Sequence, residues 1–500
     1  MDRAEEPGDG YPNRAMQASG RLCARVFLLL LICGPLGAYA QVRVETSTLI
    51  LGFDEQGSLV QATVCYPDCR NEMHRRLELR EPGGLVNFGQ TGETAWVQRR
   101  GLPGAEQSGD FHLYFTHASG QSIDWQIPSA GYRLQATVTA AGPLALRGGA
   151  GFEPREAAGF GNWLEQVRYV AVTGGEVQQI GLDEEERLQV DAAWAGFRNR
   201  YWGVLASTQR PQSFDLASGV PQSGPTVLWG ESMTEEDLVF YLGPIEPVEL
   251  QRADKVLDGL LFAGLWSWLR WICFGFFYLL AFIHSWIPVW GLAIIALSLA
   301  AYVCMWPLSR FADRLQQQVN ATESRLAPGL SRIRRESRGE EQAERILQYY
   351  KAEGVHPLYT LKSLLGVALV IPVFIGAFEM LAENIHLLHA GFLWIRDLSR
   401  PDALLQLPIE LPFFGSEFNL LPFLMTSLSL WASWLHQPSG LHADARKRKV
   451  RNMWLMAVGF FLLFYTFPAG MVLYWTTTNL IAVCRGLWAR RAEASAQQPG

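Results

Sequence analysis

Two patterns of hydrophobic and polar residues divide this chain. Between residues 42 and 250, apolar and polar side chains alternate with a period of two, as at Leu49, Leu51 and Phe53. Glycine and proline interrupt these runs at a spacing of roughly ten residues, which is typical of a sandwich of antiparallel β-strands. We therefore predict an all-β domain over residues 41–255.

The second pattern begins near Val256, where tryptophan, phenylalanine and leucine become frequent. The segment 256–286 contains Trp266, Trp268 and Trp271, but also the charged residue Arg270. Aromatic side chains of this kind hold amphipathic helices at a membrane surface. We predict an amphipathic interfacial helix over 256–286, and a membrane-spanning helix is the alternative.

Five further apolar stretches have the composition of membrane-spanning helices. They lie at residues 289–306, 361–385, 418–435, 453–467 and 470–484. Several are shorter than the ~20 residues that cross a bilayer, which suggests a locally thinned membrane. Together with the first domain they predict a multi-domain α+β membrane protein, with a five-span helical core over residues 287–491.

The basic residues between these stretches predict the side of the membrane on which each loop lies. Lysine and arginine accumulate in short cytoplasmic loops. This places segment 310–353 and the tail 492–500 in the cytoplasm of a multi-pass inner membrane protein, with the β domain in the periplasm. The basic residues expected to contact cytoplasmic partners are Arg334, Arg335, Arg338, Arg446, Lys447, Arg448 and Lys449.

Segment 310–353 carries apolar residues at heptad-like spacing on both sides of Gly339. Leu315, Val319 and Leu326 would share one face of the first arm. This spacing predicts an antiparallel helical hairpin. Pro328 would kink its first arm.

Residues 1–40 have the features of a secretory signal. Arg21 and Arg25 precede the apolar run 26–33, and Ala38-Tyr39-Ala40 offers a cleavage site. The run is short for a spanning helix, and an uncleaved N-terminal anchor is the alternative. Met16 is an alternative start, because the residues before it are acidic and rich in turn formers.

The chemistry-bearing residues outside the spans point to few sites. Cys65 and Cys69 form a nearby pair in the exported region, which predicts a local disulfide, with a redox or metal pair as the alternative. His386 and His389 have a spacing that metals use, but we interpret them as one face of an interfacial helix, with a metal site as the alternative. The sequence contains no phosphate-binding loop, zinc-protease or hydrolase motif. We therefore predict no enzyme activity, cofactor, metal or nucleic-acid substrate.

Polar residues within the spans are few, and such residues are costly in a membrane and mark function. The last span contains the run 474–479, the third contains Thr426 and Ser429, and the second begins with Lys362. We predict a polar groove that opens toward the cytoplasm. The alternative is that the hydroxyl groups bond to carbonyls of their own helices and that Lys362 extends to the membrane surface.

The order of these parts resembles the YidC-type membrane protein insertases of the YidC/Oxa/Alb family. The likeness runs from about Trp290 to Arg491. It rests on Trp290-Gly291, Met305-Trp306-Pro307-Leu308-Ser309, Tyr350-Lys351-Ala352-Glu353, His356-Pro357-Leu358, Leu393-Trp394-Ile395-Arg396-Asp397-Leu398, Phe467-Pro468-Ala469-Gly470, Leu473-Tyr474-Trp475 and Asn479-Leu480. The exported domain resembles the family's β-supersandwich in position, strand pattern and its closing Tyr241-Leu242-Gly243-Pro244.

This resemblance implies a protein that inserts and helps to fold inner membrane proteins, alone or with the Sec translocon, and without nucleotide. A polar groove in the core would receive the polar segment of a client, because unpaired polar groups cost several kcal/mol each in hydrocarbon. Nascent membrane proteins, the lipid bilayer and possible ribosome contacts are the implied partners. The implied groove residues are Tyr302, Ser298, Lys362, Thr426, Ser429, Thr476 and Asn479.

One position departs from the family pattern. The family has an arginine five residues before the proline that ends the first core span, and this chain has Tyr302 there, before Pro307. We hypothesise that Lys362 partly replaces the missing charge. The alternative is a specialised or non-inserting paralogue that acts as an assembly factor for few clients. A transporter is disfavoured, because the core lacks acid–base pairs and repeats.

Overall fold

The computed structural model describes residues 42–70, 75–81, 83–88, 97–100, 110–116, 120–142, 144–152, 157–181, 186–217, 224–229, 233–356, 358–359, 361–435 and 443–496. The predicted signal or anchor, residues 1–40, lies outside these ranges.

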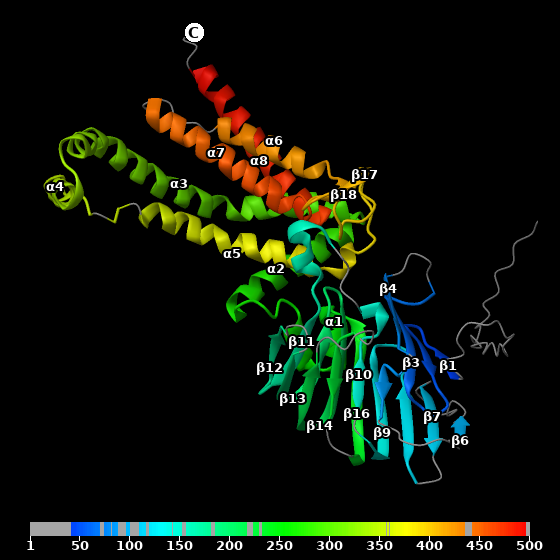
Figure 1. The fold of residues 1–500 in the computed structure, drawn as a ribbon. Coiled ribbons are helices and arrows are strands. Elements are labelled where there is room, and N and C mark those ends of the chain that lie inside the picture. The colour runs from blue at the N-terminus through cyan, green and yellow to red at the C-terminus, as the bar shows by residue number, and fades with distance from the viewer. Residues whose placement is uncertain are drawn as a thin grey trace, which may run out of the picture. The chain divides into compact units, whose positions relative to one another are not determined.

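The first half of the described chain is a large antiparallel β domain (Figure 1). Its hydrogen-bonded strand order is β1-β2-β3-β5-β10-β15-β14-β16-β9-β8-β7-β6, with β4 beside β3, and with β13, β11 and β12 continuing from β14. The strands are β1 (Val42–Glu45), β2 (Leu49–Phe53), β3 (Leu59–Tyr66), β4 (Arg75–Arg80), β5 (Val86–Asn87), β6 (Val97–Arg100), β7 (Phe111–Thr116), β8 (Ser122–Ile127), β9 (Arg133–Ala141), β10 (Ala145–Arg147), β11 (Arg168–Thr173), β12 (Glu176–Ile180), β13 (Arg187–Arg198), β14 (Trp202–Ala217), β15 (Thr226–Leu228) and β16 (Met233–Pro244).

The alternating sequence pattern produces the core of this domain. In β8, every second side chain is buried, and Trp125 lies 5.3 Å from Phe53 and 5.5 Å from Phe240 between ring centroids. The buried Trp125 indole donates a hydrogen bond to the Gly57 carbonyl (2.9 Å), so its polar atom is paired. The prediction of an extensive antiparallel β domain is confirmed.

Short helical segments interrupt and close the β domain. They are η1 (Ala150–Phe152), η2 (Gly159–Glu165) and α1 (Pro247–Ala253). The start of α1 is explained locally, because Pro247 occupies its first turn and the Glu246 carboxylate accepts hydrogen bonds from two of its free backbone N–H groups.

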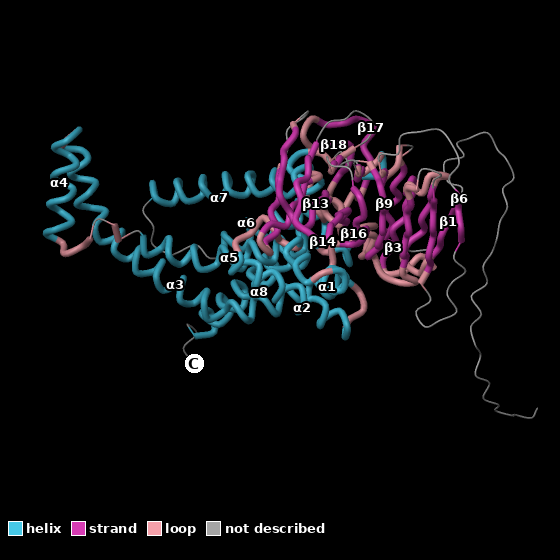
Figure 2. The backbone as a smooth tube through the Cα atoms, turned by 90° about the horizontal axis from the view of Figure 1, so that it is seen from below, coloured by secondary structure: helices cyan, strands magenta, loops and turns pink. Residues whose placement is uncertain are grey.

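The second half of the chain is mainly helical, and Figure 2 shows strands and helices gathered in separate regions. Its elements are η3 (Lys255–Leu260), α2 (Ser267–Trp286), α3 (Trp290–Glu336), α4 (Gly339–Ala352), α5 (Leu361–Glu383), η4 (Ile385–Leu387), β17 (Leu405–Leu411), β18 (Gly415–Phe418), α6 (Leu421–Leu435), α7 (Ala443–Phe464) and α8 (Ala469–Ala496).

The helix expected over 256–286 begins later than predicted. Residues 255–260 form η3, Phe262 has a φ of 56°, and α2 begins only at Ser267. Leu257 and Leu260 are fully buried in the same cluster as the β-domain core. Leu257 and Leu260 therefore belong to the protein core, whereas Trp266 before α2 and Trp268 and Trp271 within it are exposed.

Each of the five predicted apolar spans falls on a helix, namely α3, α5, α6, α7 and α8. α7 and α8 extend beyond the predicted spans into charged sequence, so these apparently short spans are parts of longer helices. Among the described residues, α2 and α3 are long and apolar enough to cross a membrane, and α6 and residues 450–464 are apolar but shorter.

α3 continues without interruption into the predicted hairpin. It has 47 residues and contains Pro307 and Pro328, so the first span and the first arm are one helix. α4 follows after Ser337 and Arg338, and Tyr349 packs so closely on Gly329 that a Cβ there would lie 2.3 Å from the ring.

The β domain also contacts the helical region directly through η2. The buried backbone N–H of Gly161 donates to the Thr466 hydroxyl in the α7–α8 turn (3.0 Å), and the rings of Phe160 and Phe413 are 5.2 Å apart. A Cβ at Gly161 would lie 2.4 Å from the Thr466 carbonyl oxygen, so only glycine fits at this contact.

We expect Gly161→Ala to weaken this contact and to lower the thermal unfolding midpoint of the detergent-solubilised full chain, since overpacking costs about 1–3 kcal/mol. It should also make η2 more susceptible to limited proteolysis. Gly181→Ala is the matched control, because a Cβ at Gly181 meets nothing within 4 Å. Equal behaviour of the two variants would contradict the close contact.

Candidate functional site

Most predicted groove hydroxyls bond within their own helices. Ser298, which is fully buried, donates to the Ile294 carbonyl (2.9 Å), and its hydroxyl also lies 3.3 Å from the Tyr474 carbonyl of α8. Thr426 and Thr476 likewise donate to carbonyls four residues earlier, each at 2.7 Å. The alternative of local hydroxyl bonding therefore holds for these three residues.

Two other predicted groove residues make contacts between helices. Asn479 of α8 donates to the Met425 carbonyl of α6 (3.3 Å). Tyr302 of α3 is half-buried, and the guanidinium carbon of Arg485 on α8 lies 6.0 Å from its ring centroid. A cation at this distance over an aromatic face is attracted to the ring. Arg485 is not among the predicted groove residues, because it lies just beyond the last apolar stretch.

Ser429 is separate from this group. It lines a cavity of about 260 Å³ between α6 and α7, together with Ser433 and Asn452. Lys362 lies in the first turn of α5, and its side chain is outside the described part of the structure. The structure thus associates Ser298 and Tyr302 with α8, and Asn479 with α6, but it places Ser429 elsewhere.

The basic residues expected to meet partners fall into two sets. Arg334, Arg335 and Arg338 are exposed at the turn between α3 and α4. Arg446 to Lys449 belong to the first turns of α7, and nothing is described of their side chains.

An aromatic cluster joins three of the helices. The Trp475 ring of α8 lies 4.7 Å from Phe374 of α5, 5.7 Å from Phe460 of α7 and 5.6 Å from Phe464 of α7. Such ring contacts add about 0.5–1.5 kcal/mol each beyond the buried area. The cluster therefore fixes α5 and α7 to α8 near the end of α7 that is opposite its basic cluster.

Two buried arginines of the β domain contact the end of α5. Arg198 is the last residue of β13, and Arg200 lies in the turn before β14. In this turn the Asn199 side chain accepts from the backbone N–H groups of Tyr201 and Trp202. Arg198, with a side chain only 4% exposed, forms an ion pair with Glu383 at 2.9 Å. The other Glu383 oxygen accepts from the backbone N–H of Phe262 (3.0 Å).

Arg200 makes a second set of contacts across the same junction. Its Nε donates to the Ala382 carbonyl, and its Nη1 donates to Glu165 of η2 (3.0 Å) and to the Ser399 carbonyl (2.9 Å). Its side chain is 3% exposed. A buried guanidinium must be paired, so these contacts fix η2 and the 399 loop relative to α5.

A third junction lies beside the disulfide. Cys65 and Cys69 form the predicted disulfide. The neighbouring Tyr66 ring lies 5.7 Å from His386, which stacks on Trp290 at 5.3 Å. Arg75 donates to the carbonyls of His386 (2.7 Å) and Leu388 (3.0 Å). His386 is thus a packed junction residue, and the described residues contain no group of three or more His, Cys, Asp or Glu side chains that could hold a metal.

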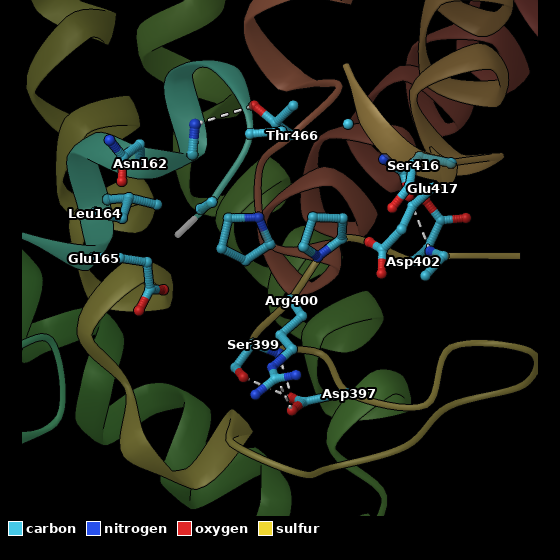
Figure 3. A pocket seen from close by; sticks show the side chains of 18 of the residues that line it. Asn162, Leu164, Glu165, Asp397, Ser399, Arg400, Asp402, Ser416, Glu417 and Thr466 are labelled. Atoms are coloured by element: carbon cyan, nitrogen blue, oxygen red, sulfur yellow. Dashed lines mark hydrogen bonds and ion pairs between the residues drawn. The ribbon is translucent and has the colours of Figure 1, made fainter. Parts of the chain in front are cut away.

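An open cleft of about 900 Å³ lies between η2, the 396–404 loop and the β17–β18 hairpin (Figure 3). Glu165 and Asn162 of η2 lie on one side of it, and Ser416 and Glu417 of β18 lie on another. Sequence reasoning missed this cleft, because η2 is more than 200 residues away in the chain from the 396–404 loop and the β17–β18 hairpin.

The comparisons with known proteins concern mainly the helical half. Residues 282–496 match the family model described as 60Kd inner membrane protein. Proteins named membrane protein insertase YidC are similar. The one from Syntrophobacter fumaroxidans is 29% identical over 288 residues (56% of this chain, 49% of the relative), and the one from Cellvibrio japonicus is 33% identical over 250 residues (49% and 40%).

The relative from Pseudoalteromonas atlantica is 28% identical over 349 residues, which is 68% of this chain and 59% of the relative. The chain thus spans about half the length of the curated relatives that it matches. A crystal structure described as an active YidC insertase aligns with 90% of this chain, and the alignment includes 93% of the chain in that structure, at 15% identity. The TM-score is 0.37, which is too low to support an argument from the fold.

Residues 282–496, most of the helical half, are thus similar to the class described as 60Kd inner membrane proteins. Over this region the chain is similar to proteins named membrane protein insertase YidC, and the resemblance inferred from its motifs is confirmed.

We expect Glu383→Gln to destabilise the full chain by on the order of 3 kcal/mol, because it leaves the buried Arg198 without its counter-charge. The midpoint of denaturant-induced unfolding in detergent would measure this change. Glu336→Gln is the control, since its partner Arg332 is 79% exposed and the pair should contribute little. A loss in the control as large as that in Glu383→Gln would refute the role of the junction.

The environment of His386 should make the stability of the folded chain depend on pH. Burial, and then the nearby charges of Arg75 and His284, lower its pKa from 6.5 to about 4. Between these values the unfolded chain takes up a proton that the folded chain does not, so the folded state loses stability as the pH falls from 6.5 toward 4. In His386→Gln, the thermal unfolding midpoint should depend less on pH over this range. His112→Gln, at an exposed site, should keep the native pH dependence. A native slope retained in His386→Gln would exclude this cause.

Proposed function

We propose that this chain is a membrane protein insertase that inserts and helps to fold inner membrane proteins. The single observation that supports this best is the match of residues 282–496 to a family whose similar members are named insertases. The described helices add physical support, because all five predicted spans coincide with helices. Polar segments of clients would cross beside α3 and α8, where Tyr302, Ser298 and Asn479 lie.

The charge pattern supports one orientation. In it, the α3–α4 hairpin and the C-terminal tail face the cytoplasm, where Arg334, Arg335 and Arg338 would meet a ribosome or nascent chain. The β domain faces the periplasm, and the protein works alone or with the Sec translocon. The groove, the five-span core and these partners are part of the proposal.

Arg485 could supply the positive charge that the family pattern has at the position of Tyr302. The family pattern has a cation at the position of Tyr302, and Arg485 brings a guanidinium to the ring of this same residue from α8. We therefore assign the groove charge to Arg485 rather than to Lys362. An assembly factor without insertion activity is the second candidate, and the substitution at Tyr302 favours it.

The test is rescue of a bacterial strain that has been depleted of its own insertase. The native chain should restore growth and client insertion, and Tyr302→Arg should add little because a cation is already present. Arg485→Ala should reduce rescue several-fold, whereas Arg485→Lys should retain it and Lys362→Ala should have little effect. Membrane levels of each variant are measured by immunoblotting.

The outcomes separate the candidates. Rescue by Tyr302→Arg alone, with equal amounts of both proteins in the membrane, would favour the assembly factor. Equal rescue by Arg485→Ala and the native chain would show that Arg485 does not supply the groove charge.

A further inference from the structure

The cleft between η2 and the β17–β18 hairpin takes no part in the groove described above. Its volume of about 900 Å³ lies near the upper end of the range for ligand sites. Thr466 and Pro468 of the α7–α8 turn form part of its wall. This turn lies at the end of α7 opposite the basic cluster, so in the proposed orientation the cleft opens on the periplasmic side.

Two residues at the cleft have buried polar atoms without a hydrogen-bond partner in the described part of the chain. They are the Nη2 of Arg200 and the Oδ2 of Asp397. Both residues line the cleft. A buried polar group without a partner is unfavourable, so these atoms favour a ligand that would pair with them.

The surroundings of Asp397 show what kind of partner is missing. Its Oδ1 accepts from the backbone N–H of His389 and from the N–H and hydroxyl of Ser399. Its Oδ2 has only ionic neighbours, the Nδ1 of His389 at 3.3 Å and the Nε of Arg400 at 3.7 Å. Oδ2 therefore still needs a donor, while the Nη2 of Arg200 needs an acceptor.

A ligand that donates and accepts in turn, and that carries little net charge, meets both needs. An anion would face carboxylates, and a cation would face guanidinium groups. The carboxylates that line the cleft are those of Glu165, Asp397, Asp402, Glu410 and Glu417, and the guanidinium groups are those of Arg200, Arg396 and Arg400. The amide groups of a polypeptide main chain offer an acceptor and a donor at each residue. The cleft also borders a hairpin of only two strands within the described residues, and unpaired strand edges accept extended peptides.

We propose that this cleft binds an extended polypeptide, namely the polar segment of a client that has just crossed the membrane. This inference rests on the proposed insertase function and adds a periplasmic holding site to it. Binding here would keep the segment from sliding back while the apolar part of the client leaves the helices.

The two faces of β17 provide a matched pair of probe positions. Glu410 lines the cleft, and its neighbour Ile409, which is 61% exposed, does not. A photoreactive benzoylphenylalanine is placed at each position in the full chain, in inverted membrane vesicles from insertase-depleted cells. The client is a ribosome-arrested single-span protein with a polar N-terminal segment, and its insertion is measured in parallel by protease protection.

We expect the probe at Glu410 to crosslink the inserted client several-fold more than the probe at Ile409. Equal background yields with a protease-protected client would overturn the cleft assignment and leave the insertase function standing. A phospholipid adduct at Glu410 in place of the client would assign the cleft to a headgroup instead. Absence of insertion would refute the proposed function itself, and this inference with it.

A blocking variant provides a second test. Ser416→Trp introduces a large side chain at an exposed position that lines the cleft, and Leu405→Trp introduces the same side chain on β17 outside it. Ser416→Trp should lower the crosslink from Glu410 several-fold, and Leu405→Trp should not. An unchanged yield in Ser416→Trp, with normal insertion, would also overturn the proposal.

Discussion

The buried arginines at the turn between β13 and β14 are the interaction on which the rest of the structure depends. Taking a guanidinium out of water costs several kcal/mol unless ion pairs and hydrogen bonds replace its hydration. Arg198 finds these partners in Glu383, and Arg200 finds them in η2, in the end of α5 and in the 399 loop. Each partner must hold its position for the charges to remain paired, so the β domain and the helical region constrain one another.

This junction also explains why a cleft exists beside it. The contacts of Arg200 draw together η2 and the 399 loop, and the contact of Gly161 with Thr466 draws η2 to the α7–α8 turn. The β17–β18 hairpin, which extends from the same loop, forms the remaining wall. The cleft is the space that remains between these segments when the contacts hold them in place.

Features that depend on neighbours in sequence could be predicted well. The alternation in β8 predicts a buried face, the apolar stretches predict the helices, and Cys65 lies close enough to Cys69 to predict their disulfide. The start of α2 could not be placed, because Leu257 and Leu260 have the same composition whether they face lipid or a protein core. The partners of Arg198 and Arg200 lie up to 199 residues away in the sequence, a separation that no local pattern can reveal.

The continuity of α3 has a mechanical consequence. One helix of 47 residues, roughly 70 Å long, runs from Trp290, past Ser298 beside α8, to the exposed arginines near its end. No loop separates the two ends, although Pro307 removes one backbone hydrogen bond between them and provides a place where the helix can bend. A small tilt of α3 within the core would therefore produce a large displacement at the far end of the hairpin.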